Sequence, residues 1–395
     1  MARKSSARYL ILVPILLAMT LAAGCGGDGD GDAGIIGLAQ GRWGHTATLL
    51  EDGRVLVVGG QETPSGKLAT AEVYDLTGTW SSAGSMSEVR GTAHTATLLA
   101  DGRVLVVGDS SSVEVYDPSS GQWSVTGSMS NERLEHTATL LVDGRVLIAG
   151  GLAGRRDLDS AEVYDPSTGE WSPTGDMSEK RQSHKAVLLG DGTVLLVGKS
   201  TAEIYDPSTG SWSLTSKLVP GKQRWGGSTL TVLVDGRVLM TGGAVNPGAT
   251  AEMPGGARGA GFMLSHPMPA LRPTDKVDIY DPSTGIWSAA SLMLEPRKFH
   301  AAILMPDGRV MVIGDDTAEM YDPAANTWSS AGELNLARFD WHTATLLEDG
   351  TVMVVGGSVG ADPFSGNYQG AEGLTAVELY KSATEWQLLR EAALP

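Results

Sequence analysis

Histidine and arginine recur in this sequence at regular positions where they could hold a metal ion or an anion. Six of the seven histidines open the same short motif: His45, His94, His136, His184, His300 and His342. Imidazole is a common metal ligand, but all ligands of one metal ion must lie within about 2 Å of it. Equivalent residues of a repeat are spread across a fold, so we interpret these histidines as structural hydrogen-bonding groups and expect no metal site and no cofactor.

The arginines precede each copy of the motif by three or four residues: Arg42, Arg90, Arg133, Arg181, Arg224, Arg297 and Arg338. Each copy is followed by one acidic residue: Glu72, Glu114, Glu162, Glu203, Asp278, Glu319 and Glu378. Our first interpretation is that these residues form ion pairs between neighbouring repeats. The alternative is that some of the arginines, namely Arg224, Arg297 and Arg338, face a central channel and hold an anionic ligand.

The repeated unit predicts four short β-strands. It consists of HTATLL, DGRVLVVGG, AEVYDPSTG and a closing Trp, and its Asp-Gly step recurs at Asp52, Asp101, Asp143, Asp191, Asp235, Asp307 and Asp349. Asp-Gly between β-rich runs is a strong hairpin signal, and Asp-Pro-Ser-Thr-Gly favours a turn into the last strand. Seven copies at a period of about 50 residues predict an all-β fold, a seven-bladed β-propeller with four antiparallel strands per blade. No strand is obviously shared between the termini, so the sequence leaves open how the ring closes.

These motifs resemble the kelch family, in particular the bacterial, galactose-oxidase-like branch of seven-bladed propellers, over residues 38–395. The resemblance supports the propeller and implies, for copper radical oxidases, a Tyr crosslinked to Cys, a second Tyr and two His. The only cysteine, Cys25, lies far from every repeat. We therefore expect that the chain is not a copper radical oxidase.

Eight aromatic residues remain outside the repeat and the leader: Trp43, Trp225, Phe262, Phe299, Phe339, Trp341, Phe364 and Tyr368. All fall in connectors between blades or in loops between strands two and three, which lie at the same end of an antiparallel blade. The longest such loops, residues 244–276 and 358–375, are in blades five and seven. We predict that blades five, six, seven and one bind a ligand there. The alternatives are that these segments merely tolerate change and that Trp43, Trp225 and Trp341 are wedges between blades. We assign no role to His266, the one histidine outside the motif.

The N-terminal residues predict export. Arg3, Lys4 and Arg8 precede a short apolar run, as in a secretory signal. The end of this run, LAAGC, resembles the lipobox of bacterial lipoproteins, which implies a signal peptide at 1–24, lipidation at Cys25 and a Gly/Asp tether at 25–37. The protein would then be extracytoplasmic and lipid-anchored to the bacterial cell membrane or outer membrane. An ordinary signal with an incidental cysteine is the alternative.

Charge and composition narrow the function. The formal net charge is −17, which disfavours binding to nucleic acid, and a single cysteine excludes an intrachain disulfide. We expect a monomeric, non-catalytic binding scaffold for a glycan or an extracytoplasmic protein. The alternative is a carbohydrate-active propeller enzyme of the mutarotase or lyase type.

Overall fold

The computed structural model describes residues 37–75, 77–198, 201–216, 218, 226–245, 272–338, 341–359, 371–382 and 385–389. The expected leader, Cys25 and nearly all of the tether lie outside these residues. Ile35–Pro395 form one compact unit. Within the described ranges, no helix is long and apolar enough to cross a membrane.

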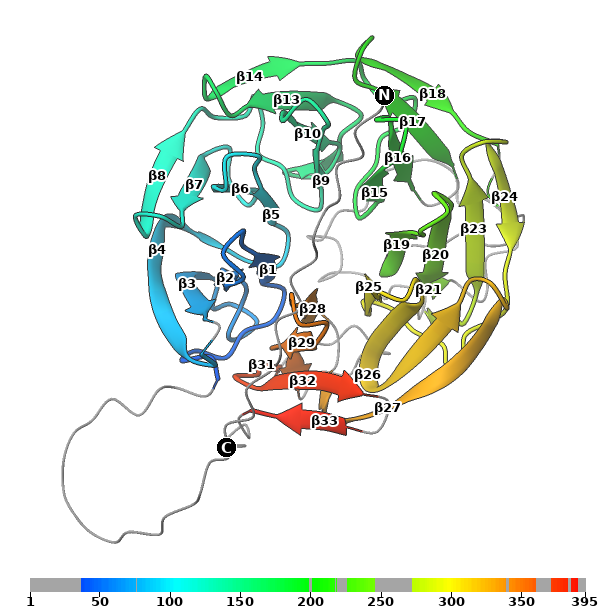
Figure 1. Cartoon of the computed structure of the whole chain (residues 1–395). Coiled ribbons are helices and arrows are strands. Elements are labelled where there is room, and N and C mark those ends of the chain that lie inside the picture. Colours follow the sequence, from blue (N-terminus) through cyan, green and yellow to red (C-terminus); the bar gives the residue numbers. More distant parts are fainter. Residues whose placement is uncertain are drawn as a thin grey trace, which may run out of the picture. The chain divides into compact units, whose positions relative to one another are not determined.

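The seven repeats fold into seven antiparallel blades arranged around an axis, in chain order (Figure 1). Blade one contains β1 (Thr46–Leu49), β2 (Val55–Val58), β3 (Leu68–Tyr74) and β4 (Trp80–Arg90). Blade two contains β5 (Thr95–Leu98), β6 (Val104–Val107), β7 (Val113–Asp117) and β8 (Gln122–Thr126). Blade three contains β9 (Thr137–Leu140), β10 (Val146–Ala149), β13 (Ala161–Asp165) and β14 (Glu170–Pro173). Blade four contains β15 (Lys185–Leu188), β16 (Val194–Val197), β17 (Ala202–Asp206) and β18 (Ser211–Leu214).

The last three blades follow the same plan, with one variation in blade six. Blade five contains β19 (Ser228–Val232), β20 (Val238–Gly242), β23 (Val277–Asp281) and β24 (Ile286–Ala289). Blade six contains β25 (Ala301–Leu304), β26 (Val310–Asp322) and β27 (Thr327–Arg338). Blade seven contains β28 (Thr343–Leu346), β29 (Val352–Val355), β32 (Val377–Ser382) and β33 (Glu385–Leu388). In blade six the single element β26 covers both middle-strand positions: residues 310–313 pair with β25, and residues 315–322 pair with β27.

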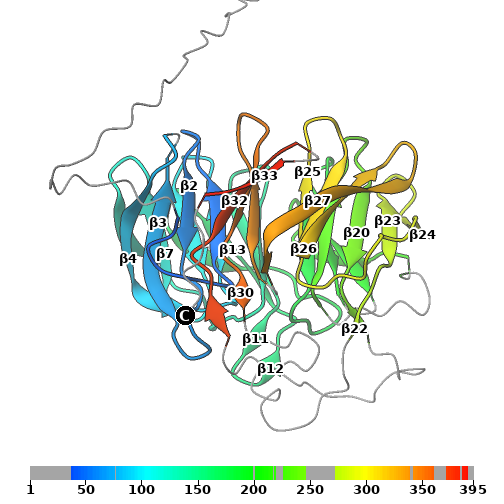
Figure 2. The same ribbon diagram turned by 90° about the horizontal axis from the view of Figure 1, so that it is seen from below.

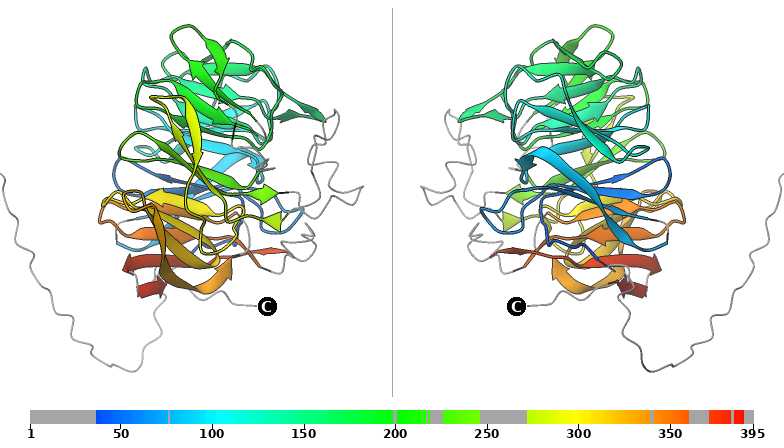
Figure 3. Two further views of the ribbon diagram at one scale, coloured as in Figure 1. Left: turned by 90° about the vertical axis from the view of Figure 1, so that its right-hand side faces the viewer. Right: turned by 90° about the vertical axis from the view of Figure 1, so that its left-hand side faces the viewer.

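Three of the loops between strands two and three form small ladders of their own. These pair β11 (Leu152–Ala153) with β12 (Arg156–Asp157), β21 (Ala244–Val245) with β22 (Arg272–Pro273), and β30 (Ser358–Val359) with β31 (Glu372–Gly373). Figure 2 shows β11, β12, β22 and β30 on one side of the ring, and Figure 3 shows the same ladders projecting from that side in two further views. We call this side the connector face and the opposite side, which carries the Asp-Gly turns, the turn face.

The core lies between the blades, which explains why strand two is apolar throughout. Along β2, Leu56 and Val58 pack on blade two, whereas Val55 and Val57 pack on Met353 and its neighbours in blade seven. Seven such clusters surround the axis. Each pair of neighbouring blades therefore shares one hydrophobic core. Burying each side chain of this size contributes roughly 1.5–3 kcal/mol to the stability of the fold.

The ring closes without a shared strand. The innermost strands β1, β5, β9, β15, β19, β25 and β28 contact one another in a complete circle. At the closing junction, His45 Nε2 hydrogen-bonds with Thr343 Oγ1 at 2.8 Å, and the Arg42 N–H donates to Leu374 O at 3.1 Å. Side-chain packing and the segment before β1 therefore join blade one to blade seven.

Candidate functional site

Three of the eight predicted aromatic residues lie in the described part of the chain: Trp43, Phe299 and Trp341. Trp225, Phe262, Phe339, Phe364 and Tyr368 lie outside the described residues, as do Arg224, His266 and Cys25. The site is therefore built here from blades six, seven and one.

Phe299 and Trp341 occupy one structurally equivalent position, directly before the histidine that leads into an innermost strand. We call this the axial position; its members with positive φ are Gly44, Glu135, Ser183, Gly227, Phe299 and Trp341, with φ between 52° and 70°. The left-handed backbone lets the N–H of one member donate to the carbonyl oxygen of the member in the preceding blade. Such bonds join Gly44 to Trp341 at 3.0 Å and Phe299 to Gly227 at 2.7 Å. Two members that carry aromatic side chains are thus fixed near the axis by their own backbone.

The three aromatic rings pack together, and we call them the aromatic triad. The rings of Trp43 and Trp341 are stacked, with centroids 5.1 Å apart and planes inclined by 7°. Phe299 meets the same Trp341 edge-on, with centroids 5.1 Å apart and planes at 69°. The ammonium group of Lys298 lies 5.5 Å from the Phe299 ring centroid. The connectors that lead into blades one, six and seven thus bring these three aromatic side chains into contact.

The members of the triad differ in exposure. Trp43 is only 3% exposed and pairs through its backbone with Gln61, with both N to O distances at 2.9 Å. Phe299 and Trp341 are both half-buried and retain accessible surface. Trp43 therefore supports Trp341 from within the fold, which fits the interpretation of Trp43 as a wedge. Trp341 and Phe299 are left as the surface that a ligand could contact.

The recurring arginines are structural, and the hypothesis that Arg297 and Arg338 hold an anionic ligand is wrong. Both are at most 1% exposed and pair with Glu319 and Glu378 at 2.8 and 2.9 Å. The same pairing joins Arg42–Glu72, Arg90–Glu114, Arg133–Glu162 and Arg181–Glu203, at 2.5–3.2 Å. Burial lowers the pKa of Arg338, and the Glu378 carboxylate opposes that shift. A guanidinium held this way cannot reach a ligand without leaving its buried carboxylate unpaired.

These pairs join blades, as the sequence predicted. The backbone carbonyl of Arg297 accepts a hydrogen bond from Gly243 in blade five at 2.8 Å. Its side chain binds blade six, where the guanidinium donates to Gly314 O at 2.6 Å as well as to Glu319. We call this arrangement the arginine bridge, and Arg42 forms it across the closing junction between blades seven and one.

The recurring histidines are also structural. Nε2 of His136 hydrogen-bonds with Thr95 Oγ1 of the preceding blade at 2.9 Å, and His184 contacts Thr137 in the same way at 3.0 Å. Burial lowers the pKa of both rings to about 3, with the nearby arginine of the bridge adding to the shift. Each ring is therefore neutral at physiological pH and forms part of the contact between two blades.

A polar group near the axis was missed in the sequence. Glu135 and Ser183 occupy axial positions in blades three and four, and the Ser183 hydroxyl donates to the Glu135 carboxylate. Lys185 follows at the start of β15, where blades one, two, three, five and seven have threonine. The surrounding protein lowers the pKa of Lys185, and the Glu135 carboxylate opposes this. The replacement of threonine by lysine in one copy of HTATLL was the signal that could have identified this group.

The axial positions carry two kinds of chemistry. Blades six and seven present aromatic rings, while blades three and four present a carboxylate and a hydroxyl, with the amine of Lys185 two residues after Ser183. Ring faces bind the apolar C–H surface of a sugar or an apolar side chain, and the polar group can exchange hydrogen bonds with a ligand.

Comparison with known proteins supports the fold. Residues 135–178, which span blade three, match the kelch motif. No curated protein sequence matches the chain. Among solved structures, the chain is similar to a fungal alcohol oxidase described as showing catalytic diversity among the AA5 family, in complex with copper. The sequence identity is 20% and the TM-score 0.63, over 84% of this chain and 73% of the oxidase chain.

The donor set of the described residues does not fit a copper centre. No group of three or more His, Cys, Asp or Glu side chains in the described ranges is placed to hold a metal ion. The six recurring histidines lie in six different blades, and each is about 5% exposed and engaged between blades. The similarity to the oxidase is therefore one of fold.

Proposed function

We propose that this seven-bladed β-propeller, which has a kelch motif in its third blade, is a non-catalytic binding scaffold. It would hold a glycan or a protein ligand on its connector face, near the axis. The observation that carries this proposal is the aromatic triad, in which half-buried Phe299 and Trp341 are backed by buried Trp43. The equivalent axial positions in blades one and five are glycine. The two rings are therefore additions to the repeat and are not needed to build it.

Aromatic surface on a rigid support suits ligand binding. Rings that are already packed lose little conformational freedom when a ligand arrives, so more of the contact energy is available for binding. The arginine bridges and the shared hydrophobic cores hold the blades that carry the triad in place. Many different ligands are bound by propellers, so the ligand class depends on these side chains and not on the fold.

We also propose that the scaffold is exported and anchored to a membrane by lipid at Cys25. The support is the sequence pattern alone: a basic start, a short apolar run and a cysteine after small residues. Cys25→Ser should move the protein from the membrane fraction to the soluble fraction of cells. Retention in the membrane fraction would contradict lipidation at this residue.

The binding proposal is tested on a glycan array with protein that starts at residue 25 and carries Cys25→Ser. The double variant Phe299→Ala/Trp341→Ala should lose the captured glycans, while Leu214→Ala, at a 61% exposed outer-strand position, should keep them. Glycan capture that survives the double variant would contradict the site. If no glycan is captured, crosslinking on intact cells with the same variants tests a protein ligand.

The second candidate is a carbohydrate-active enzyme, favoured by the polar group at the axis. Lys185 could move a proton on a bound sugar, because its surroundings lower the pKa of this exposed amine, and the carboxylate of Glu135 is charged opposite to it. Exchange NMR of sugar anomers with wild-type protein and with Glu135→Gln tests this. Faster exchange that depends on Glu135 would favour the enzyme.

A further inference from the structure

A second set of arginines joins the blades on the turn face. Arg54, Arg103, Arg145, Arg237 and Arg309 directly follow the Asp-Gly turn, and we call them turn-face arginines. Each binds the aspartate of its own turn at 2.6–2.7 Å. Arg54 also donates to Pro118 O in blade two at 2.9 Å, and Arg103 donates to Pro166 O in blade three at 3.0 Å.

All five turn-face arginines also lie close enough to the core tyrosine of the next blade for an electrostatic interaction. The tyrosines are Tyr116, Tyr164, Tyr205, Tyr321 and Tyr380. The guanidinium therefore has a fixed place at these junctions, bordered by its own aspartate and by the next blade's tyrosine.

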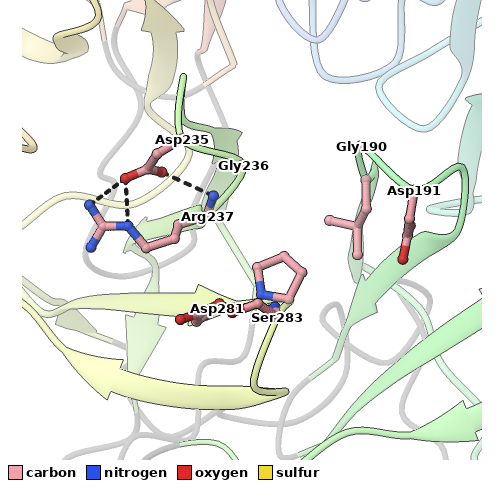
Figure 4. Close-up of a pocket in the computed structure, with 9 residues that line it drawn as sticks. Gly190, Asp191, Asp235, Gly236, Arg237, Asp281 and Ser283 are labelled. Atoms are coloured by element: carbon pink, nitrogen blue, oxygen red, sulfur yellow. Dashed lines mark hydrogen bonds and ion pairs between the residues drawn. The ribbon is translucent and has the colours of Figure 1, made fainter.

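The junction between blades four and five lacks this arginine. Thr193 stands in its place, and its hydroxyl donates to Asp191 of its own turn at 2.7 Å. A hollow of about 470 Å³ lies at this junction, lined by residues 189–191 of blade four and by residues 235–237 and 281–283 of blade five. Figure 4 shows Gly190 and Asp191 on one side of it and Asp235, Arg237 and Asp281 on the other.

Two of the groups around the hollow correspond to groups that contact an arginine elsewhere. Pro282 lines it and corresponds to Pro118 and Pro166, which accept hydrogen bonds from Arg54 and Arg103. Asp191 corresponds to the aspartates that bind the turn-face arginines. Burial raises the pKa of Tyr280, and the Asp191 carboxylate adds to this. Burial also raises the pKa of Tyr116 and Tyr321, but there the neighbouring arginine opposes the shift.

The described residues show a second difference at this junction, although the Ser216 hydroxyl donates across it to Gly285 O at 2.6 Å. In five of the blades the core tryptophan donates from Nε1 to a carbonyl oxygen in or next to the outer strand of the preceding blade, as Trp171 does to Gly127 O at 2.8 Å and Trp212 to Gly175 O at 2.8 Å. Nε1 of Trp287 in blade five is buried and has no such partner among the described residues. A ligand in the hollow would therefore add a contact between two blades that lack both the turn-face arginine and the tryptophan bond among the described residues.

We propose that this hollow binds an arginine side chain of a basic partner protein, which takes the place of the missing turn-face arginine. A guanidinium offers planar donors that match a carboxylate and a carbonyl oxygen together, whereas an ammonium does not. The net charge of −17 attracts a basic partner. The site lies on the turn face, so it is separate from the proposed ligand site on the connector face.

The test uses saturation-transfer NMR with N-acetyl-arginine amide as the probe. The citrulline analogue is neutral and of similar shape, and the lysine analogue carries the charge without the planar donors. We expect saturation of the arginine probe only. Equal binding of the citrulline or the lysine analogue would overturn the assignment of a guanidinium site.

Site-directed variants test where the arginine probe binds. Thr193→Arg should fill the hollow, abolish probe binding and raise the melting temperature, whereas Val142→Arg, at a 77% exposed position of blade three, should leave probe binding unchanged. Asp191→Asn should weaken the binding of the probe about threefold, which is the effect expected when an exposed ion pair is lost. This second variant tests the site even if Thr193→Arg does not fold. Probe binding that persists unchanged in either site variant would overturn the proposal.

Discussion

The left-handed backbone at Phe299 and Trp341 separates these residues from the rest of the repeat. Such a conformation costs an ordinary residue roughly 1–2 kcal/mol compared with glycine. Blades one and five place glycine there, at Gly44 and Gly227. Blades six and seven have Phe299 and Trp341 at this position despite the cost. Two aromatic rings therefore lie near the axis, where the proposed ligand would bind.

The first prediction separates binding from folding at this position. Phe299→Gly should change the free energy of unfolding by less than about 1 kcal/mol, because relief of the backbone offsets the lost ring contact. Ligand capture should fall. Urea denaturation measures the first effect and the glycan array the second.

Gly227→Ala is the matched control for Phe299→Gly. A methyl group at Gly227 would lie 2.9 Å from Phe299 N on a backbone with φ of 70°. This variant should therefore lose stability. A loss of more than about 3 kcal/mol in Phe299→Gly would instead show that the ring is a packing element.

The second prediction concerns the stability of the fold at acidic pH. Burial holds the pKa of His136 and His184 at about 3 and that of His342 at about 4, whereas an unfolded histidine titrates near 6.5. The unfolded chain therefore binds more protons below pH 6.5. The stability from the neutral rings is complete above that pH and is lost as the pH falls towards 3, by up to about 1.4 kcal/mol per pH unit for each ring.

Urea denaturation between pH 7 and pH 4 measures this loss. His136→Asn removes one of the titrating rings, so its stability should fall less steeply with decreasing pH than that of the wild type. An identical slope in the two proteins would show that other groups, such as the carboxylates of the turns, govern acid unfolding.

At the scale of elements, the arginine bridge determines how one blade is joined to the next. Glu378→Gln would leave the fully buried Arg338 without its counter-charge. We expect a loss of about 3–5 kcal/mol in the free energy of unfolding. The control is Asp307→Asn on the turn face, where both partners of the ion pair are about half exposed. This change should cost no more than about 1 kcal/mol, and equal losses in the two variants would contradict a structural bridge.

The strands and their order could be predicted from the sequence because each blade repeats the same local signals. Within each repeat of about 50 residues, Asp-Gly predicts the hairpin between strands one and two. The apolar second strand and the Tyr–Trp pair predict which side chains are buried between blades, and the structure confirms these features. The single element β26 was not predicted, because strand continuity through residues 314–317 depends on backbone geometry and not on residue type.

The candidate site was predictable only in part. The connectors of Trp43, Phe299 and Trp341 were expected on one face, and the structure brings these three together. Sequence spacing could not show that Trp43 would be buried, because its exposure depends on a neighbouring blade. The hollow between blades four and five was missed for the same reason: residues of two blades, far apart in the sequence, line it.

At the scale of the whole molecule, two of the seven junctions lack a turn-face arginine. Between blades four and five, and between blades seven and one, threonine replaces the turn-face arginine. At the same junctions, the buried Nε1 atoms of Trp287 and Trp80 have no hydrogen-bond partner among the described residues. We therefore expect these two junctions, which separate blades one to four from blades five to seven, to be weaker than the other five.

The fourth prediction is that the ring opens first at these junctions. In hydrogen exchange read by mass spectrometry, peptides covering β24 and the start of β4 should exchange faster than those covering β8 and β14. Thr193→Arg should slow exchange in β24 and leave β14 unchanged. Uniform exchange of the four outer strands would contradict two weaker junctions.

Closure without a shared strand has a consequence for how the gene can evolve. Each blade is one uninterrupted stretch of chain, so a single in-frame duplication or deletion in the gene adds or removes a complete blade. A copied blade brings its own arginine, histidine and apolar strand, which are the groups its new neighbours contact. Once copied, it can diverge at a few positions, as blade four has at Thr193 and Lys185, while the contacts that hold the ring together are kept.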